Sequence, residues 1–365
     1  MVNPSLRPVR WQPPTNQRPV TRRTTVRTLP RLTLIPLPGE GPEHVAVDGE
    51  GRLVTGLADG RVLRVTADGK HTEVLAETGG RPLGVEVLGD GALVVCDAQK
   101  GLLRVDPSDG KIDVLCDRVA GEPLILCSNA APAADGSIFF TQSSQRFGLD
   151  RYKGDLLEHS GTGRLLRYDG RDGSVTVLSE GLHFANGVVL SPGADGSGDS
   201  VIVAETGGYQ LTRHWLTGDL AGTDEVFAAT PAGFPDNLTT GPTGLVWAAM
   251  VSPRDPLLDW LHPRGPGLRN AVWALPDRLQ PGPRDVAWLT AFGPDGAVVH
   301  DLCGWGAGYR AVTAAREHEG KVYLGSLTER AIAVFDLSPR GSLMSMHHEN
   351  TTDETHVSTT AENRS

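Results

Sequence analysis

The pattern of hydrophobic and polar positions along the chain predicts strands rather than helices. Short apolar runs, such as residues 52–56 and 92–96, alternate with turns that contain Gly, Asp or Pro. Apolar residues spaced three and four apart, as an amphipathic helix requires, are scarce. Short apolar runs bounded by turn residues are typical of β-strands, so we expect an all-β protein.

The strand pattern repeats as six units, most of them with three strands joined by two turns and some with a weaker fourth strand. The entry positions of the first five units are 40, 47, 57 and 50 residues apart; they are Pro42, Pro82, Asn129, Asn186 and Asp236. A four-stranded unit at this period is a propeller blade. We therefore predict a six-bladed β-propeller with four-stranded blades, whose radial closure leaves few free strand edges.

Composition sets the expected bounds of the propeller. Residues 1–30 are rich in Arg, Pro and Thr, and residues 341–365 are mostly polar, so both ends are expected to be disordered and residues 31–340 to form the propeller. In the fifth unit we expect a loop over one face at residues 252–270, followed by a strand at 271–275. Such a loop either shapes a binding site or is a plain surface insertion.

Charge and segment composition exclude several classes of partner. The 365 residues carry a net charge of −10, and the body of the chain has no basic cluster, which argues against nucleic acid. No apolar run is long enough to span a membrane, and the basic N-terminus lacks the apolar stretch of a secretory signal. We therefore expect that neither nucleic acid nor a membrane is a partner, and the oligomeric state is left open.

The cysteines do not form a recognisable metal or redox motif. Cys96, Cys116, Cys127 and Cys303 show no CxxC spacing, so neither a disulfide framework nor a zinc site built on cysteine is expected. A cytoplasmic location is the default for such a chain.

Polar residues at the entries of the inner strands form the candidate site. The innermost strand of every blade lines the propeller axis, so equivalent entry positions make a ring on one face. The ring contains two carboxylates and three amides: Glu43, Asn129, Asn186, Asp236 and Asn237. An oxygen-only cage suits Ca²⁺, with Mg²⁺ or Mn²⁺ as alternatives, whereas Zn²⁺ prefers His and Cys ligands. The plainer interpretation is that each residue is a polar turn residue.

Other candidates for chemistry are weaker. His183 precedes Asn186 by three residues and either faces the same cavity or caps a strand. His300 and Asp301 are placed near the sixth blade, where a general base or a structural role is conceivable. The chain has no GxSxG elbow and no phosphate-binding GxxxxGK[ST] loop, so serine-based hydrolysis and nucleotide chemistry are not indicated.

An ordered set of short motifs resembles a known family. The set lies within residues 35–338 and consists of segments 79–84, 97–103, 161–166, 184–187, 204–206, 234–237 and 324–326. It resembles the strictosidine-synthase-like branch of six-bladed propellers, which belongs with the SMP-30/gluconolactonase and paraoxonase hydrolases. The resemblance implies that Glu43, Asn186 and Asp236 hold a cation. It implies further that Asn129 contacts metal or substrate and that Asn237 is an additional amide ligand.

Two departures from the family pattern narrow the expected activity. The catalytic Glu of true strictosidine synthases falls at about Thr313 here, and Thr cannot act as the carboxylate base, so that activity is not expected. The His that paraoxonase-like enzymes carry in the segment matching residues 81–84 is also absent, which argues against a His-dyad mechanism.

These observations predict a metal-dependent hydrolase of a lactone or related ester. The cation would polarise the carbonyl, while Asp236 would orient or deprotonate water and Asn129, with Asn237, would fix the carbonyl oxygen. The alternative is a non-enzymatic propeller, a scaffold or small-ligand binder whose cation is structural. An open ligand position facing a pocket would distinguish the enzyme from the scaffold.

Overall fold

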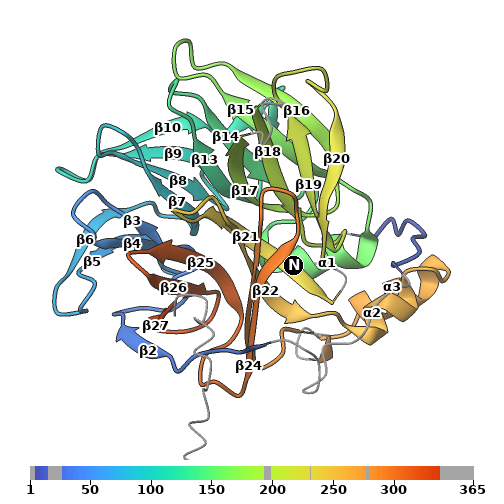
Figure 1. Ribbon diagram of the computed structural model, residues 1–365. Helices are drawn as coiled ribbons and strands as arrows, with labels where there is room; N and C mark the ends of the chain where they lie inside the picture. The colour runs from blue at the N-terminus through green and yellow to red at the C-terminus, as the bar shows by residue number, and fades with distance from the viewer. Residues whose placement is uncertain are drawn as a thin grey trace, which may run out of the picture.

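The structure, a computed structural model, describes residues 5–14, 27–192, 199–230, 232–276, 279–280 and 282–337. These residues form six four-stranded blades, which confirms the predicted six-bladed β-propeller (Figure 1). In each blade the strands are antiparallel and the chain runs from the innermost strand outward. The first strands of neighbouring blades contact one another around the axis.

The first three blades follow the chain in order. Blade one consists of β3 (Ala46–Val47), β4 (Leu53–Gly56), β5 (Arg61–Val65) and β6 (Thr72–Glu77). Blade two consists of β7 (Pro82–Val87), β8 (Leu93–Asp97), β9 (Gly101–Val105) and β10 (Ile112–Cys116). A small hairpin of β11 (Arg118–Val119) and β12 (Glu122–Pro123) leads into blade three. Blade three consists of β13 (Cys127–Pro132), β14 (Ile138–Gln142), β15 (Gly163–Tyr168) and β16 (Val175–Leu182).

The last three blades complete the ring. Blade four consists of β17 (Ala185–Pro192), β18 (Asp199–Glu205), β19 (Gln210–Trp215) and β20 (Asp224–Ala229). Blade five consists of β21 (Gly233–Thr240), β22 (Val246–Pro253), β23 (Val286–Phe292) and β24 (Val298–Trp305), with β1 (Arg27–Thr28) added in parallel at its outer edge. Blade six consists of β25 (Val312–His318), β26 (Lys321–Ser326), β27 (Ala331–Asp336) and β2 (Thr33–Pro36).

Short helices lie on one side of the propeller. A 3₁₀ helix, η1 (Leu149–Arg151), and α1 (Tyr152–Glu158) interrupt blade three, while α2 (Pro256–Leu261) and α3 (Pro266–Trp273) interrupt blade five. Figure 1 shows α2 and α3 projecting beyond the blades, on the side where α1 lies. No helix among the described residues is long and apolar enough to cross a membrane.

The expectation of a third strand at residues 271–275 was wrong. These residues belong to α3 and the turn that follows it, and the third strand of blade five is β23. Pro266 occupies the first turn of α3, where its fixed φ favours a helix and its missing N–H costs nothing. The apolar run packs as a helix because Trp273 and Val272 join a core with Phe147 and Leu157.

Residues 5–14 pack on these helices, which differs from the disorder that composition predicts for residues 1–30. Leu6 is buried in the same core, and the backbone N–H of Val9 donates to the Glu158 carbonyl. The guanidinium of Arg269, buried in α3, donates to the Val9 carbonyl at 2.9 Å. The segment therefore joins α1 to α3. The predicted polar tail, 341–365, lies outside the described residues.

The ring closes through a strand from the N-terminal part of the chain. β2 pairs antiparallel with β27, with Ile35 opposite Ile332 in the register. Ile35 points into the core between blades one and six, whereas its neighbour Leu34 is exposed. The fourth strand of blade six thus comes from a segment about 300 residues away from its partner.

Ile35 and Leu34 provide a matched test of this closure. Ile35→Ser removes buried apolar contact and leaves a polar group in the core, so the free energy of unfolding should fall by about 2–5 kcal/mol. Leu34→Ser, on the exposed face of the same strand, should change it by no more than about 0.5 kcal/mol. Urea unfolding of both variants measures this, and equal effects would contradict the assigned register.

Candidate functional site

A β-bulge at the entry of the inner strands β13, β17 and β21 directs the candidate residues of these blades toward the axis. The pairing register shifts between Cys127 and Ala130 in β13, between Ala185 and Val188 in β17, and between Pro235 and Leu238 in β21. The residues inside these bulges include Asn129, Asn186, Asp236 and Asn237. A bulge leaves its extra residue outside the ladder, which frees these side chains for the site.

Glycine allows the strand entries to approach one another closely. A Cβ atom on Gly187 would lie 2.1 Å from the backbone nitrogen of Leu238, and one on Gly84 would lie 2.8 Å from the Asn129 Cα. Both distances are shorter than a side chain tolerates, so the entries of neighbouring blades meet backbone to backbone.

The five predicted ring residues are brought together in the structure. Asn186 Nδ2 donates to Asp236 Oδ1 at 2.6 Å, and Asn129 Nδ2 donates to Asn237 Oδ1 at 3.1 Å. The Asn237 amide donates in turn to the Glu43 carbonyl at 3.4 Å. Residues from blades one, three, four and five therefore form one hydrogen-bonded group, although up to 194 positions separate bonded partners.

Hydroxyl groups fix the frame around this ring. Ser128 Oγ donates to Asn186 Oδ1 at 2.9 Å, which sets the orientation of that amide. Thr206 Oγ1 donates to the Pro235 carbonyl, and Thr313 Oγ1 donates to the Glu43 carbonyl, each at 2.6 Å. Thr313 lies in β25, so its hydrogen bond joins blade six to the entry of blade one, where the ring closes.

The two carboxyl groups are buried close to each other. Burial raises the pKa of Glu43 to about 7, although the nearby Arg81 guanidinium and a hydrogen bond from Asn237 act against that rise. Burial also raises the pKa of Asp236 well above its usual value, and repulsion from Glu43 adds to the rise. Positive charge between these groups would therefore be stabilising.

Two buried oxygen atoms of the ring are left without a hydrogen-bond donor. Glu43 Oε2 and Asn129 Oδ1 have no partner among the described residues. An unsatisfied buried acceptor is costly unless a cation or water completes it. A hard cation fits this donor set, because two carboxylates and several amide oxygens are the ligands it prefers. No group of three or more His, Cys, Asp or Glu side chains suited to a metal occurs in the described part of the chain.

The ring forms the floor of a pocket. The pocket is an open cavity of about 1140 Å³, counted out to the surrounding solvent, and Glu43, Asn186 and Asp236 are among its lining residues. Asn129 and Asn237 are fully buried and lie behind this lining. The Asn129 side chain is therefore held by Asn237 at the back of the pocket, with its unpartnered Oδ1 in the ring.

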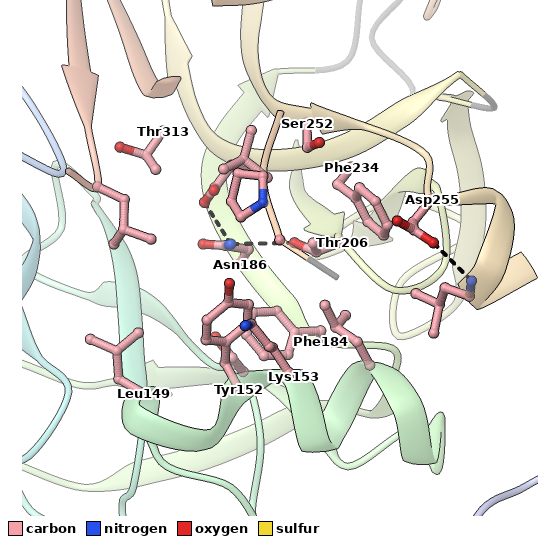
Figure 2. A pocket seen from close by; sticks show the side chains of 18 of the residues that line it. Leu149, Tyr152, Lys153, Phe184, Asn186, Thr206, Phe234, Ser252, Asp255 and Thr313 are labelled. Carbon is pink, nitrogen blue, oxygen red and sulfur yellow. Dashed lines mark hydrogen bonds between the residues drawn. The ribbon is translucent and has the colours of Figure 1, made fainter. Parts of the chain in front are cut away.

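Apolar side chains form most of the pocket wall. Figure 2 shows Tyr152 and Lys153 of α1 on one side of the cavity and Thr313 and Ser252 on the other. Helix α2 supplies Leu258 and Leu261. The remaining apolar lining comes from several blades and consists of Leu83, Leu126, Leu149, Leu156, Leu157, Phe184, Phe234, Val251, Pro253, Pro283 and Leu327. A bound molecule would meet oxygen atoms at the floor and hydrocarbon at the sides.

Comparison with known proteins places the chain in a family. The family descriptions "strictosidine synthase" and "strictosidine synthase-like, N-terminal" match residues 131–219 and 27–65. The chain is 33% identical over 325 residues to an adipocyte plasma membrane-associated protein of Salmo salar, a match that covers 82% of this chain and 76% of the relative. It is 32% identical over 338 residues to Protein STRICTOSIDINE SYNTHASE-LIKE 10 of Arabidopsis thaliana, covering 84% and 88% of the two chains. The chain belongs to the strictosidine synthase-like family.

A solved structure shares the fold of this strictosidine synthase-like protein at lower identity. A gluconolactonase from Xanthomonas campestris superposes with a TM-score of 0.61 and 18% identity, covering 92% of this chain and 97% of that one. At this identity the likeness concerns the fold alone.

One family position differs from what strictosidine synthase chemistry requires. Thr313, the position to which the family resemblance assigns the catalytic Glu of true strictosidine synthases, lines the pocket, and its hydroxyl donates to the Glu43 carbonyl. The carboxyl groups that line the pocket belong instead to Glu43, Asp236 and Asp255.

The other candidate residues do not line the pocket. His183 stacks on His159, with ring centroids 4.0 Å apart, and Trp11 covers His159 on another side. His300 stacks on Trp247, while Asp301 accepts a hydrogen bond from Trp288 Nε1 at 2.7 Å. These residues therefore have structural roles here.

Sequence reasoning missed the wall that α1 contributes. The signal was present, because Leu149, Tyr152 and Leu156, which line the pocket, are spaced three and four residues apart as on an apolar helix face. The segment is only seven residues long, which is too short for periodicity to stand out against the strand pattern. In the segment of residues 81–84 the sequence indicated only that a His is absent. It did not indicate that the Arg81 guanidinium lies close to Glu43.

The histidine stack behind the pocket wall predicts a loss of stability in acid. Burial lowers the pKa of His159 to about 2 and that of His262 to about 4, and it also lowers the pKa of His183. The unfolded chain gains protons below about pH 6.5 while the folded one does not, so stability falls as the pH drops through this range. Each group contributes about 1.4 kcal/mol per pH unit.

His159→Phe tests this linkage because Phe keeps an aromatic ring in the stack and removes one titrating group. Urea unfolding at pH 8, 6 and 5 should give a variant whose stability declines less steeply below pH 6.5 than that of the wild type. The pH 8 measurement is the reference for the packing change alone. Parallel pH profiles for both proteins would contradict the assignment of His159 as a buried neutral group.

Proposed function

We propose that this protein is a metal-dependent hydrolase of apolar lactones or related esters. The observation that carries the proposal is a buried pair of carboxyl groups, Glu43 and Asp236, with the unpartnered oxygens Glu43 Oε2 and Asn129 Oδ1 beside it at the floor of an apolar pocket. The Xanthomonas campestris gluconolactonase has the same fold, which is consistent with this proposal. The pocket gives a carbonyl group a polar floor and gives the rest of the substrate a hydrocarbon wall.

Glu43, Asp236, Asn186 and Asn129 would hold the cation, and Asn237 would orient Asn129. Ca²⁺ suits this oxygen set best, with Mg²⁺, Mn²⁺ and Zn²⁺ as alternatives. When bound, a divalent cation supplies Lewis-acid polarisation of the carbonyl. The ligand positions on three pocket-lining residues leave the site accessible from the cavity, as catalysis requires.

Asp236 is the residue best placed to handle the proton of the attacking water. Its carboxylate is oriented by Asn186 Nδ2 and by the backbone N–H of Asn237, and it faces the pocket. A water held by Asp236 adds to the carbonyl carbon while its proton passes to the carboxylate. That proton is then delivered to the departing alkoxide oxygen as the ester C–O bond breaks.

Asn129 has a different role from the one its sequence position suggests. It is buried behind the pocket lining and its oxygen is unpartnered, so it would act as a ligand of the cation rather than as a donor to the carbonyl. The hydroxyl groups of Ser128 and Thr206 line the pocket and hold Asn186 and the Pro235 carbonyl in place. They position the site without taking part in bond breaking.

The metal assignment is tested by removing one carboxylate charge at a time. Glu43→Gln and Asp236→Asn should each weaken Ca²⁺ binding by about tenfold or more, because each removes one of two negative ligands. Glu317→Gln is the matched control, since Glu317 is also buried but bonds to Trp247 Nε1 away from the pocket. Calorimetric titration measures all three, and unchanged affinity in both site variants would exclude the cage.

The substrate assignment is tested with a series of aryl esters of increasing acyl length, with and without chelator. If the acyl chain enters the apolar pocket, kcat/KM should rise about threefold per added methylene until the pocket is filled. Phe184→Ala should reduce the gain in kcat/KM per added methylene. It should change the turnover of acetate esters less, because Phe184 belongs to the apolar wall of the pocket and not to its polar floor. A preference for polyol lactones over long-chain esters would contradict an apolar substrate.

Measuring the bound metal together with turnover distinguishes a wrong choice of substrate from a protein that is not an enzyme. Turnover lost on chelation and restored by added cation supports a catalytic metal. A metal-loaded protein that turns over no ester or lactone in the series is instead a scaffold or ligand binder with a structural cation.

A further inference from the structure

The helices α2 and α3 present an apolar face to solvent. Five of the twelve large hydrophobic side chains that are exposed in the described residues lie between residues 257 and 279; they are Leu257, Trp260, Leu268, Leu275 and Leu279. The exposed fractions of Leu257, Trp260 and Leu268 are 44%, 47% and 45%. Figure 1 shows both helices standing out from the blades, so this face is not covered by the propeller body.

Two neighbouring side chains of α3, Leu268 and Arg269, depart from the pattern of an ordinary surface helix. Arg269 is fully buried and donates to the carbonyls of Val9, Leu157 and Glu158, whereas Leu268 beside it is exposed. An amphipathic helix normally buries its apolar side and exposes its charge. The helix thus buries an arginine, of which one nitrogen bonds to three carbonyls, while leaving a leucine in water, and an exposed apolar cluster of this kind marks an interaction surface.

Helix α2 carries apolar residues on two faces. Leu258 and Leu261 line the pocket, while Leu257 and Trp260, three residues apart, share the opposite, exposed face. The Arg264 guanidinium lies over the Trp260 ring at 3.9 Å from its centroid. Tryptophan beside arginine is a pair that suits the boundary between hydrocarbon and charged head groups.

The charge around this face is opposite to that of the whole molecule. Residues 5–14 and 254–276 together hold five arginines and two aspartates, whereas the chain as a whole carries a net charge of −10. The Arg10 guanidinium lies beside Gly265, in the turn between α2 and α3. Asp259 forms an ion pair with Arg254 and accepts a hydrogen bond from the Tyr209 hydroxyl, and Asp255 caps the N-terminus of α2. The outward charge near the apolar face is therefore basic.

We propose that this face, formed by Leu257, Trp260 and Leu268 with Arg10 and Arg264, docks the protein on an anionic lipid surface. Apolar side chains would enter the head-group region while the arginines contact lipid phosphates. The sequence predicts no membrane partner because no apolar run is long enough to span a bilayer. Docking through a surface face does not require such a run. Because the opposite face of α2 lines the pocket, the attached protein would hold its pocket close to the lipid. The proposal does not depend on ester hydrolysis.

Vesicle flotation with the full chain tests the proposal. Wild type should float with vesicles of phosphatidylcholine and phosphatidylserine and should bind less to phosphatidylcholine alone or at high salt. The triple variant Leu257→Ser, Trp260→Ser, Leu268→Ser should bind at least about tenfold more weakly. The control variant Val114→Ser, Val226→Ser removes exposed apolar side chains from β10 and β20, and it should bind like wild type.

The arginines are tested separately from the apolar side chains. Arg10→Gln and Arg264→Gln should each weaken binding to the anionic vesicles about fivefold and leave binding to neutral ones unchanged. Melting temperatures equal to wild type would show that the variants fold, as substitutions at exposed positions should allow. No flotation of wild type, or flotation of the triple variant equal to wild type, would overturn the proposal. A wild-type dimer that the triple variant converts to monomer, without vesicle binding, would assign the face to self-association instead.

Discussion

The antiparallel pairing of β2 with β27 is the contact on which the candidate site depends. It joins blade six to a strand from the start of the propeller and holds blades one and six side by side. Glu43 lies on one side of that seam, and Thr313, which donates to its carbonyl, lies on the other. Without the pairing, one of the two carboxylates would have no fixed position relative to Asp236.

Closure of the ring also explains why the site is electrostatically demanding. Four of the five polar side chains at the axis lie in bulges that turn them inward, and glycines let the backbones of neighbouring blades touch. The same close packing removes water from Glu43 and Asp236, which raises the pKa of both. Burying two carboxylates costs stability unless positive charge accompanies them, and Arg81 is the nearby cation that the fold itself supplies. A bound cation would offset the remaining cost of burying the two carboxyl groups.

The sequence was sufficient to predict the blades and the ring but not the structures above them. Strand periodicity repeats six times, so a local signal is reinforced, and Asn129, Asn186 and Asp236 stand at matched entries. The run at residues 271–275 carries the same local signal, and only the position of Pro266 and contacts with Phe147 make it helical. Residues 5–14 look disordered by composition because their order comes from distant partners such as Glu158 and Arg269.

The helices that the sequence did not predict, α1 and α2, supply the apolar wall of the pocket. A propeller axis alone offers a polar ring open to water, whereas α1 and α2 add hydrocarbon walls to the pocket above that ring. In forming that wall α2 uses Leu258 and Leu261, and it leaves Leu257 and Trp260 about half exposed to solvent. A six-residue helix buried on both faces would need another layer of structure, which the described residues do not provide. Its outer face is therefore most simply explained by a surface outside the protein.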